Sequence, residues 1–250
     1  MRFKTARRGI FFYIGVGILQ RFSRTKMLIG EKGLSALAAA KVVILGVGGV
    51  GSYAAEALVR AGIGCLRLVD HDVVDISNIN RQLHALDSTV GKAKVAVLAD
   101  RYREINPELC LEPIQEFYVP EQGQALLAGC DWVLDAVDTV AAKTDIVCSS
   151  LQAGRKVISC MGTGNKLDAA LLRVDDISKT VNCPLARSVR RELGKQGIRS
   201  GVPVVWSPEL PQSHEESQSP RIPASISYVP AAAGLLMASY VVNRIIQLKS

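Results

Sequence analysis

Apolar and polar residues alternate along the chain with two periods, which divide most of it into strands and helices. Short apolar runs predict strands at the start of 41–62 and at 65–70, 109–114, 132–136, 156–160 and 171–174. Apolar residues at helical spacing predict helices at the end of 41–62 and at 21–40, 92–105, 121–128, 140–153, 184–195 and 231–248. This order indicates an α/β fold with a Rossmann-like, doubly wound, mostly parallel sheet, a C-terminal extension and an apolar C-terminal helix.

Two segments do not fit this alternation. Residues 1–20 begin with basic side chains and continue into an apolar stretch at 10–19, an order typical of a signal peptide. No A-x-A cleavage site follows, and the stretch is too short to span a bilayer. We interpret 1–20 as an extension without an assigned role, with a weak membrane anchor or a signal peptide as alternatives. Residues 206–224 are rich in Ser, Pro, Glu and Gln, which predicts a mobile surface loop.

Residues 21–248 have the size of one α/β domain. The apolar helix at 231–248 contains Asn243 and Arg244, which favours a core helix over a membrane span. Six cysteines are scattered over apolar segments and form no CxxC pair, which argues against a four-thiolate zinc site. This pattern is typical of reduced thiols in a cytosolic protein.

A glycine-rich turn follows the first strand and leads into a helix. It contains Gly46, Gly48, Gly49 and Gly51. Backbone N–H groups at such a helix N-terminus attract phosphate, and glycine lets phosphate and helix approach closely. Asp70 ends the next strand about 20 residues later, where a carboxylate can bind ribose hydroxyls. The combination predicts a nucleotide site.

A polar run after Asp70 indicates which nucleotide binds. Arg81 carries a planar charged fork suited to phosphate oxygens, and Lys94 can reach a phosphate from the next helix. Asp138, which follows another strand at the same sheet edge, is a candidate Mg²⁺ ligand. Such charges stabilise a departing pyrophosphate, so the run predicts ATP and adenylation of a carboxylate. The other candidate nucleotide-binding residues are Asp72, Ser77, Asn78, Asn80 and Gln82.

These motifs resemble those of the ubiquitin-activating-enzyme superfamily of the ThiF/MoeB/HesA type. The matching stretches are GVGGVG at 46–51, DHD at 70–72, SNINRQ at 77–82, GKAK at 91–94 and DAVD at 135–138. Within the superfamily the chain looks closest to the tRNA threonylcarbamoyladenosine dehydratase group. That closer resemblance rests on the stretches at 80–85, 159–166, 176–180, 183–187 and 225–230.

The resemblance implies an enzyme that dehydrates, and thereby cyclises, threonylcarbamoyladenosine next to the tRNA anticodon. ATP would convert the threonyl carboxylate to an acyl-adenylate, and internal attack would close the ring. The implied cofactors are ATP and Mg²⁺, with a monovalent cation left open. The resemblance also implies a homodimer in which Arg24 reaches the partner's ATP. The expected catalytic residues are therefore Arg24, Arg81, Lys94 and Asp138.

The basic balance of the chain fits a tRNA partner. The formal net charge is +7, and the helix at 184–195 carries several cations against one acid, Glu192. This helix face suits RNA phosphates, with a plain solvated surface as the alternative. The candidate tRNA-binding residues are Arg187, Arg190, Arg191 and Lys195.

Alternatives remain open at several points. The same motifs serve adenylation of the C-terminal glycine of a ubiquitin-like sulfur carrier, a function that would gain from CxxC pairs and a loop cysteine. Cys160 and Cys183 are the nearest candidates for a catalytic thiol, which an intramolecular ring closure does not require. His84 is a candidate either for orienting the substrate or for a structural role. We expect a cytoplasmic protein without a DNA partner or membrane association. A sulfur-transfer partner of the cysteine desulfurase type is an open alternative.

Overall fold

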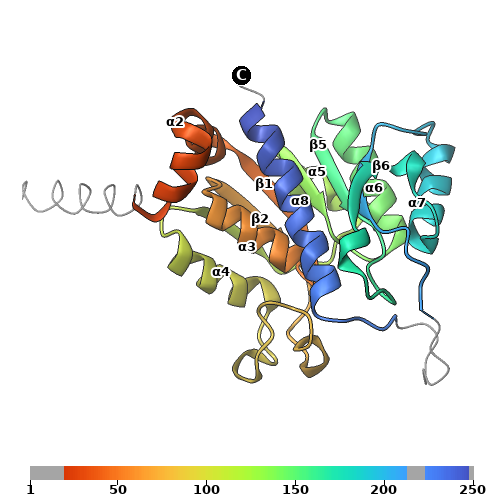
Figure 1. The fold of residues 1–250 in the computed structure, drawn as a ribbon, viewed down its shortest axis with the longest axis horizontal. Helices are drawn as coiled ribbons and strands as arrows, with labels where there is room; N and C mark the ends of the chain where they lie inside the picture. The colour runs from red at the N-terminus through yellow and green to blue at the C-terminus, as the bar shows by residue number, and fades with distance from the viewer. Residues whose placement is uncertain (1–19, 213–222, 248–250) are drawn as a thin grey trace, which may run out of the picture.

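The structure is a computed structural model that describes residues 20–212 and 223–247. Its seven-stranded sheet has the strand order β3-β2-β1-β4-β5-β7-β6 (Figure 1). Neighbouring strands are parallel except β6 and β7, which are antiparallel. The expected α/β fold with a mostly parallel sheet is confirmed. The strands are β1 Lys41–Leu45, β2 Cys65–Val69, β3 Cys110–Ile114, β4 Trp132–Asp135, β5 Lys156–Cys160, β6 Arg173–Asp176 and β7 Pro203–Trp206.

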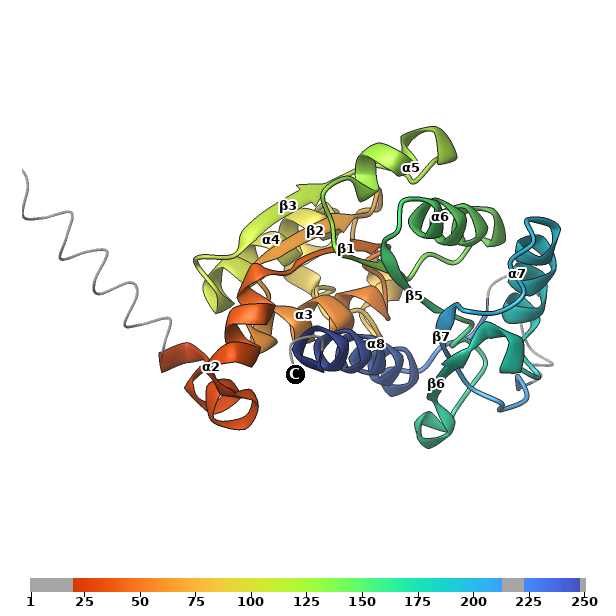
Figure 2. The same cartoon turned by 90° about the horizontal axis from the view of Figure 1, so that it is seen from above.

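Helices cover both faces of the sheet (Figure 2). One face packs against α2 Ser23–Ala39, α3 Gly51–Ala61, α4 Lys94–Ile105 and α8 Tyr228–Gln247. The other packs against α5 Pro120–Leu127, α6 Val140–Gln152 and α7 Pro184–Lys195. Successive strand residues alternate between the two cores. In β1, Val42 and Ile44 join the first core, whereas Val43 and Leu45 join the second.

The carboxyl ends of the parallel strands place the predicted site residues at one edge of the sheet. The register pairs Leu45 of β1 with Val69 of β2 on one side and with Asp135 of β4 on the other. The residues that follow these three are Gly46, Asp70 and Ala136. The glycine turn therefore lies between the end of β2 and the segment that leads from β4 to α6, where ligands of such sheets bind.

α8 is a core helix of this domain. Among the described helices it is the one that is long and apolar enough, by length and composition, to cross a membrane. In the structure it packs along α3 (Figure 1), and Ala233, Met237 and Val241 are fully buried. Gly234 lies so close to α3 that a Cβ there would be 2.2 Å from the Val50 carbonyl oxygen. The pattern-based interpretation of 231–248 as a core helix agrees with this packing.

The structure differs from the expected elements at three points. β7 has four residues and begins at a proline, and periodicity does not reveal so short a run. The predicted loop at 206–224 begins too early, because Trp206 is the last residue of β7 and both Trp206 and Ser207 are buried. α8 begins at Tyr228, three residues earlier than expected, because Pro230 is tolerated in a first helical turn. Residues 1–19 and 213–222, which hold most of the N-terminal extension and of the predicted loop, lie outside the described residues.

Two helical glycines should respond in opposite directions to alanine. Gly234→Ala places a methyl group against the Val50 carbonyl oxygen, so the free energy of unfolding should fall by about 1–3 kcal/mol. The new methyl group of Gly194→Ala in α7 would meet no atom within 4 Å among the described residues outside the backbone of its own helix, so this free energy should rise by up to about 1 kcal/mol. Urea denaturation measures both effects. A Gly234→Ala variant as stable as the wild type would contradict the close contact between α3 and α8.

Candidate active site

The tight fold of the glycine turn requires two of its glycines, because no side chain fits at their positions. Gly46 has a φ of +82°, and a Cβ there would lie 2.8 Å from the Ala136 carbonyl oxygen. A Cβ on Gly51 would lie 1.9 Å from the Gly46 carbonyl oxygen. A Cβ on Gly48, by contrast, would meet only the Gln82 side-chain amide, at 3.7 Å. The turn itself requires Gly46 and Gly51, whereas Gly48 leaves room for a ligand group to approach the backbone.

The remaining glycine of the turn serves a third purpose. A Cβ on Gly49 would lie 3.2 Å from the Cβ of Pro230, in the first turn of α8. Gly49 thus lets the start of α8 approach the candidate site.

The Asp70 carboxylate ties the glycine turn to the loop after β2. Its Oδ2 accepts a hydrogen bond from the Val47 N–H at 2.7 Å, and its Oδ1 accepts one from the Asp72 N–H at 2.9 Å. A carboxylate has about four acceptor positions, so the buried Asp70 can accept further hydrogen bonds. The ribose contact expected of Asp70 remains a prediction, and the structure adds a role in shaping the turn.

Lys94 brings a buried positive charge to the same edge. Its Nζ lies 2.6 Å from Oδ2 of Asp72, and its side chain is almost entirely buried. Oδ1 of Asp72 lies 3.1 Å from Nε2 of His71. Asp70, His71 and Asp72 form the group of possible metal ligands within 4.8 Å of one another in the described residues. Their carboxylate oxygens already bind backbone N–H groups, Lys94 and His71, so this group is a poor metal site.

The first part of the polar run is folded by its own side chains. Asp75 Oδ1 accepts from the Ser77 N–H at 2.8 Å, and Asn78 Oδ1 accepts from the Asp75 N–H at 3.2 Å. These two bonds form a capping box around the short 3₁₀ helix Ile76–Asn78. Asn78 is therefore buried with a structural function, while Ser77 is exposed.

Arg81 is held beside this short helix. Its Nη1 donates to the Ser77 carbonyl oxygen and to Asn80 Oδ1, both at 2.8 Å. Asn80 in turn donates through Nδ2 to the Ser225 carbonyl oxygen at 3.1 Å, which ties the polar run to the segment before α8. Arg81 is half-buried, and the rest of its guanidinium fork remains available to an anion.

Two buried side chains beside these residues have unused polar atoms. Gln82 Oε1 and both ring nitrogens of His84 have no hydrogen-bond partner among the described residues. Burial, and then the charge of nearby Lys94, lower the pKa of His84 to about 4. His84 is therefore neutral at physiological pH and shielded from solvent, which favours its structural role over contact with substrate.

Asp138 is an exposed carboxylate on the segment between β4 and α6. Beneath it lies an ion pair that the sequence interpretation missed: Asp135 and Lys143 are fully buried, with Nζ and Oδ2 3.0 Å apart. A signal existed, because Lys143 stands one turn before Ile146 and Val147 on the buried side of α6. A lysine within the apolar stripe of a helix requires a buried partner.

Arg24 is exposed in the first turn of α2. α2 leads into the amino end of β1, away from the loops at the carboxyl edge (Figure 1). Within one chain, therefore, Arg24 is not brought to the candidate site. Its expected role requires a second subunit, which a single chain does not test.

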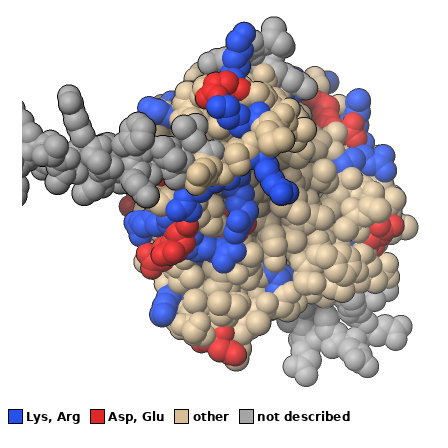
Figure 3. Space-filling model, turned by 60° about the vertical axis from the view of Figure 1, so that its left-hand side comes forward, with Lys and Arg blue, Asp and Glu red and all other residues tan. Residues whose placement is uncertain are grey.

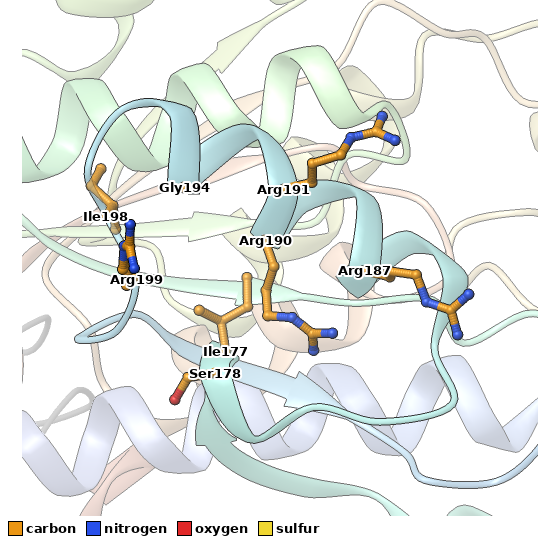
Figure 4. A pocket seen from close by; sticks show the side chains of 8 residues that line it. All are labelled: Ile177, Ser178, Arg187, Arg190, Arg191, Gly194, Ile198 and Arg199. Atoms are coloured by element: carbon orange, nitrogen blue, oxygen red, sulfur yellow. The ribbon is translucent and has the colours of Figure 1, made fainter.

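The arginines of α7, together with Arg199 beyond its end, line a hollow of about 400 Å³ (Figure 4). α7 starts near the carboxyl edge of the sheet, because a Cβ on Gly162, after β5, would lie 3.6 Å from Cys183 Sγ. Arg187 and Arg190 extend along the same side of α7, whereas Arg191 points to the other side. The residues that line the hollow are Ile177, Ser178, Arg187, Arg190, Arg191, Gly194, Ile198 and Arg199.

These cations differ in how firmly they are held. Arg190 donates from Nη1 to the carbonyl oxygen and to Oγ1 of Thr180, which fixes α7 to the preceding segment. Arg191 and Lys195 both pair with Glu192, at 3.1 and 2.6 Å. Arg187 and Arg199 form no ion pair with any residue that the structure describes.

The two candidate thiols are both buried. Burial raises the pKa of Cys160 to about 12, which leaves it a thiol rather than a nucleophilic thiolate. This environment gives Cys160 no support as a catalytic nucleophile.

The buried histidine predicts a specific pH dependence of stability. The pKa of His84 is about 4 in the folded chain and about 6.5 when unfolded, so the unfolded state binds the extra proton between these values. This contribution is present above pH 6.5 and is lost as the pH falls towards 4. Between pH 7 and pH 5 the wild type should lose about 2 kcal/mol more unfolding free energy than His84→Asn. Urea denaturation at both pH values measures this difference, and equal losses would contradict a neutral buried His84.

Comparisons with known proteins agree with this geometry. The model of the ThiF family matches residues 22–250. A tRNA threonylcarbamoyladenosine dehydratase of Bacillus subtilis is 42% identical over 239 residues, which cover 90% of this chain and 94% of that protein.

Solved structures of the tRNA N6-threonylcarbamoyladenosine dehydratase TcdA of Escherichia coli have the same fold. Its complex with AMP aligns with a TM-score of 0.86 and 33% identity, and its complex with ATP with a TM-score of 0.84 and 34% identity. Each alignment covers 92% of this chain and 95% of the other. Because the family model spans nearly the whole chain and the Bacillus relative matches almost end to end, the chain belongs to the ThiF family.

Proposed function

We propose that this protein is an ATP-dependent tRNA threonylcarbamoyladenosine dehydratase, formed by one ATP-binding domain at 21–248. The observation that carries the proposal is the 42% identity to the Bacillus subtilis dehydratase over almost the full length of both chains. The site geometry agrees, because the turn leaves open space at Gly48, and the loops that follow at the same sheet edge carry Arg81 and Lys94. The family relationship and the six cysteines, none of which forms a disulfide in the described residues, together support a cytoplasmic location.

The chemistry that such a site performs has two steps. First, an oxygen of the threonyl carboxylate attacks the α-phosphorus of ATP, and pyrophosphate leaves with the electrons of the broken P–O bond. Second, a nucleophile of the same modified nucleoside attacks the acyl carbon and AMP leaves, which carries away one carboxylate oxygen. The net change is loss of water from the nucleoside. Because the second step is unimolecular, orientation supplies much of its rate and no catalytic thiol is needed.

The residues divide this work according to their surroundings. Backbone N–H groups of the glycine turn and the dipole of α3 face the phosphates, with Asp70 at the ribose. Arg81 and Lys94 balance the charge that develops on pyrophosphate, and Lys94 shares its ammonium between Asp72 and the phosphate. Asn80 holds the loop that presents Arg81, because it bonds both Arg81 and the Ser225 carbonyl oxygen. The unused amide oxygen of Gln82 is open to a donor group of the nucleotide.

Asp138 fits the role of a magnesium ligand. Mg²⁺ usually binds through one or two carboxylates together with substrate phosphates and water, so one exposed carboxylate at the phosphate edge is sufficient. Bound there, Mg²⁺ would supply positive charge to the leaving pyrophosphate.

The hollow beside α7 supports a proposal about tRNA. Arg187, the partly neutralised Arg191 and Arg199 line this hollow, which starts near the carboxyl edge at Arg187 and runs along α7 away from that edge towards Arg199. Lys195, paired with Glu192, adds charge near the end of α7, and such a basic surface suits phosphates of the RNA backbone. Arg190 differs, because Thr180 already holds its guanidinium. We therefore give Arg190 a positioning role within this surface.

Dehydration can be tested directly. The protein is incubated with ATP, Mg²⁺ and tRNA that carries the linear modification. The tRNA is then digested to nucleosides, and their masses are measured by mass spectrometry. We expect loss of one water that depends on ATP, and a loss of activity of about a hundredfold or more in Arg81→Ala and Asp138→Ala. Arg103→Ala removes an exposed arginine of α4 whose ion pair in the described part of the chain is with Asp100; this variant is the control and should act as wild type. An unchanged nucleoside mass with folded, ATP-binding protein would contradict the proposal.

The same assay tests the subunit arrangement. If Arg24 acts on the partner's ATP, mixing inactive Arg24→Ala and Arg81→Ala subunits restores one competent site per dimer. Failure of the mixture to recover activity, under conditions where the subunits exchange, would rule out this role of Arg24.

Binding of tRNA should depend on the arginines beside α7. The double variant Arg187→Ala/Arg199→Ala should raise the KM for tRNA and lower the salt dependence of tRNA binding by about one unit of slope per arginine. Its KM for ATP should not change.

The control for this prediction is Arg60→Ala/Arg101→Ala. Both arginines pair with Glu56, and they lie on α3 and α4, on the opposite side of the molecule from α7 (Figure 1). Figure 3 shows that the face of α2, α3 and α4 carries basic side chains among acidic ones. Equal effects of the two double variants would refute a specific role for α7.

A further inference from the structure

A fully buried polar cluster lies directly beneath the segment that carries Asp138. It joins Asp135 at the end of β4, Lys143 in the first turn of α6 and Ser159 in β5, and none of the three is exposed. Lys143 Nζ lies 3.0 Å from Asp135 Oδ2 and 3.3 Å from Ser159 Oγ. The Ser159 hydroxyl donates to the same Oδ2 at 2.5 Å. One carboxylate oxygen is thus fixed by two donors from two different elements.

The second oxygen of Asp135 binds the segment that carries Asp138. Its Oδ1 accepts a hydrogen bond from the Val137 N–H at 3.2 Å. Val137 directly precedes Asp138, so the carboxylate holds the backbone next to the proposed metal ligand. The cluster therefore connects the interior of the sheet to the exposed segment at its edge.

The other side of this segment is held by the glycine turn. The Ala136 N–H donates to the Leu45 carbonyl oxygen at 2.8 Å, which extends the pairing of β1 and β4 by one residue. The Ala136 carbonyl group packs against Gly46 so closely that no Cβ fits there. The next residue, Val137, is held by the Asp135 carboxylate, which accepts its N–H. This bond fixes the backbone just before Asp138.

Stability alone is a weak reason for such a cluster. Removing two charges from water costs several kcal/mol per ion, and well-packed apolar residues in their place are often as stable or more so. The neighbours of Lys143 on α6, Ile146 and Val147, show that this position lies in an otherwise apolar core. A buried cluster of this kind gives orientation, because each polar atom has a fixed partner.

We propose that Lys143 and Ser159 are positioning residues for Asp138. They fix Asp135, Asp135 holds the Val137 N–H, and this contact sets where the Asp138 carboxylate stands beside the glycine turn. The inference rests on the proposed function in one respect, the role of Asp138 as ligand of the metal that accompanies ATP. Groups that orient a metal ligand typically change metal affinity by about 10–100-fold when they are removed.

The decisive comparison uses two buried serines that differ in what they hold. Ser159→Ala removes a hydroxyl that donates to Asp135, whereas Ser150→Ala removes an equally buried hydroxyl that donates to the Ile146 carbonyl oxygen within α6. Affinity for Mn²⁺ in the presence of ATP is measured by electron paramagnetic resonance, with no tRNA present. Ser159→Ala should weaken Mn²⁺ binding about tenfold, and Ser150→Ala should leave it within about twofold of the wild type.

A second readout follows the backbone itself. Hydrogen exchange of peptides that cover residues 135–140 should become faster in Ser159→Ala and remain unchanged in Ser150→Ala, because only the first loosens the Val137 N–H.

Substitution of Lys143 adds a further test, in which a second substitution should restore Mn²⁺ affinity. Lys143→Met leaves the Asp135 carboxylate buried without its cation, and Mn²⁺ affinity in the presence of ATP should fall by about tenfold or more. In the double variant Asp135→Asn/Lys143→Met no buried charge remains, and the amide oxygen can still accept the Val137 N–H. Much of the Mn²⁺ affinity should therefore return.

The outcomes separate this inference from the proposed function. Wild-type Mn²⁺ affinity and hydrogen exchange in Ser159→Ala, or equal losses in both serine variants, would overturn the inference even if Lys143→Met fails to fold. Wild-type Mn²⁺ affinity in Asp138→Ala would also overturn it. If the wild-type protein leaves the modified nucleoside unchanged while the serine comparison holds, the proposed function fails and the positioning role stands.

Discussion

The glycine turn after β1 is the constraint on which the rest of the site depends. It passes between two neighbouring strands with no space for a side chain at Gly46 or Gly51. The Asp70 carboxylate fixes one side of it through the Val47 N–H, and the packing of Ala136 fixes the other. Because the strands are parallel, this contact brings the loops that follow β1, β2 and β4 to a single edge.

Around this turn the acidic side chains divide into those that hold backbone and those that remain accessible. Asp70, Asp75 and Asp135 each accept hydrogen bonds from one or two backbone N–H groups, and they define the paths of three loops. Asp138 is exposed, and Asp72 is engaged with the ammonium of Lys94. Lys94 is paired with Asp72, and Arg81 donates to Asn80 and to the Ser77 carbonyl oxygen. A bound triphosphate would therefore compete with these protein groups rather than with bulk water. This preorganisation is how a protein stabilises charge that develops during a reaction.

The sequence predicts the parts of this arrangement that depend on local spacing. The strand, glycine turn and helix at 41–62 and the alternating elements that follow can be assigned from periodicity, and GVGGVG and SNINRQ locate the site. The four-residue β7 could not be predicted, because its strand character depends on pairing with β5 and β6. The structural function of Asn78 and the tether of Arg190 to Thr180 depend on contacts that residue type does not disclose. Lys143 in the apolar stripe of α6 indicates a buried partner, but that this partner is Asp135, together with Ser159, becomes visible only when the sheet is assembled.

The central claim is that the carboxylate of the modified nucleoside is activated as an adenylate, and isotope transfer tests it most directly. The threonyl carboxylate of the tRNA substrate is labelled with ¹⁸O, and a single turnover is run with ATP. The products are separated, and the ¹⁸O content of each is measured by mass spectrometry. Attack on the α-phosphorus predicts that the ¹⁸O lost from the nucleoside appears in AMP. Label in inorganic phosphate would indicate activation at the γ-phosphorus, and label in water alone would indicate dehydration without an adenylate. Either result would contradict the account.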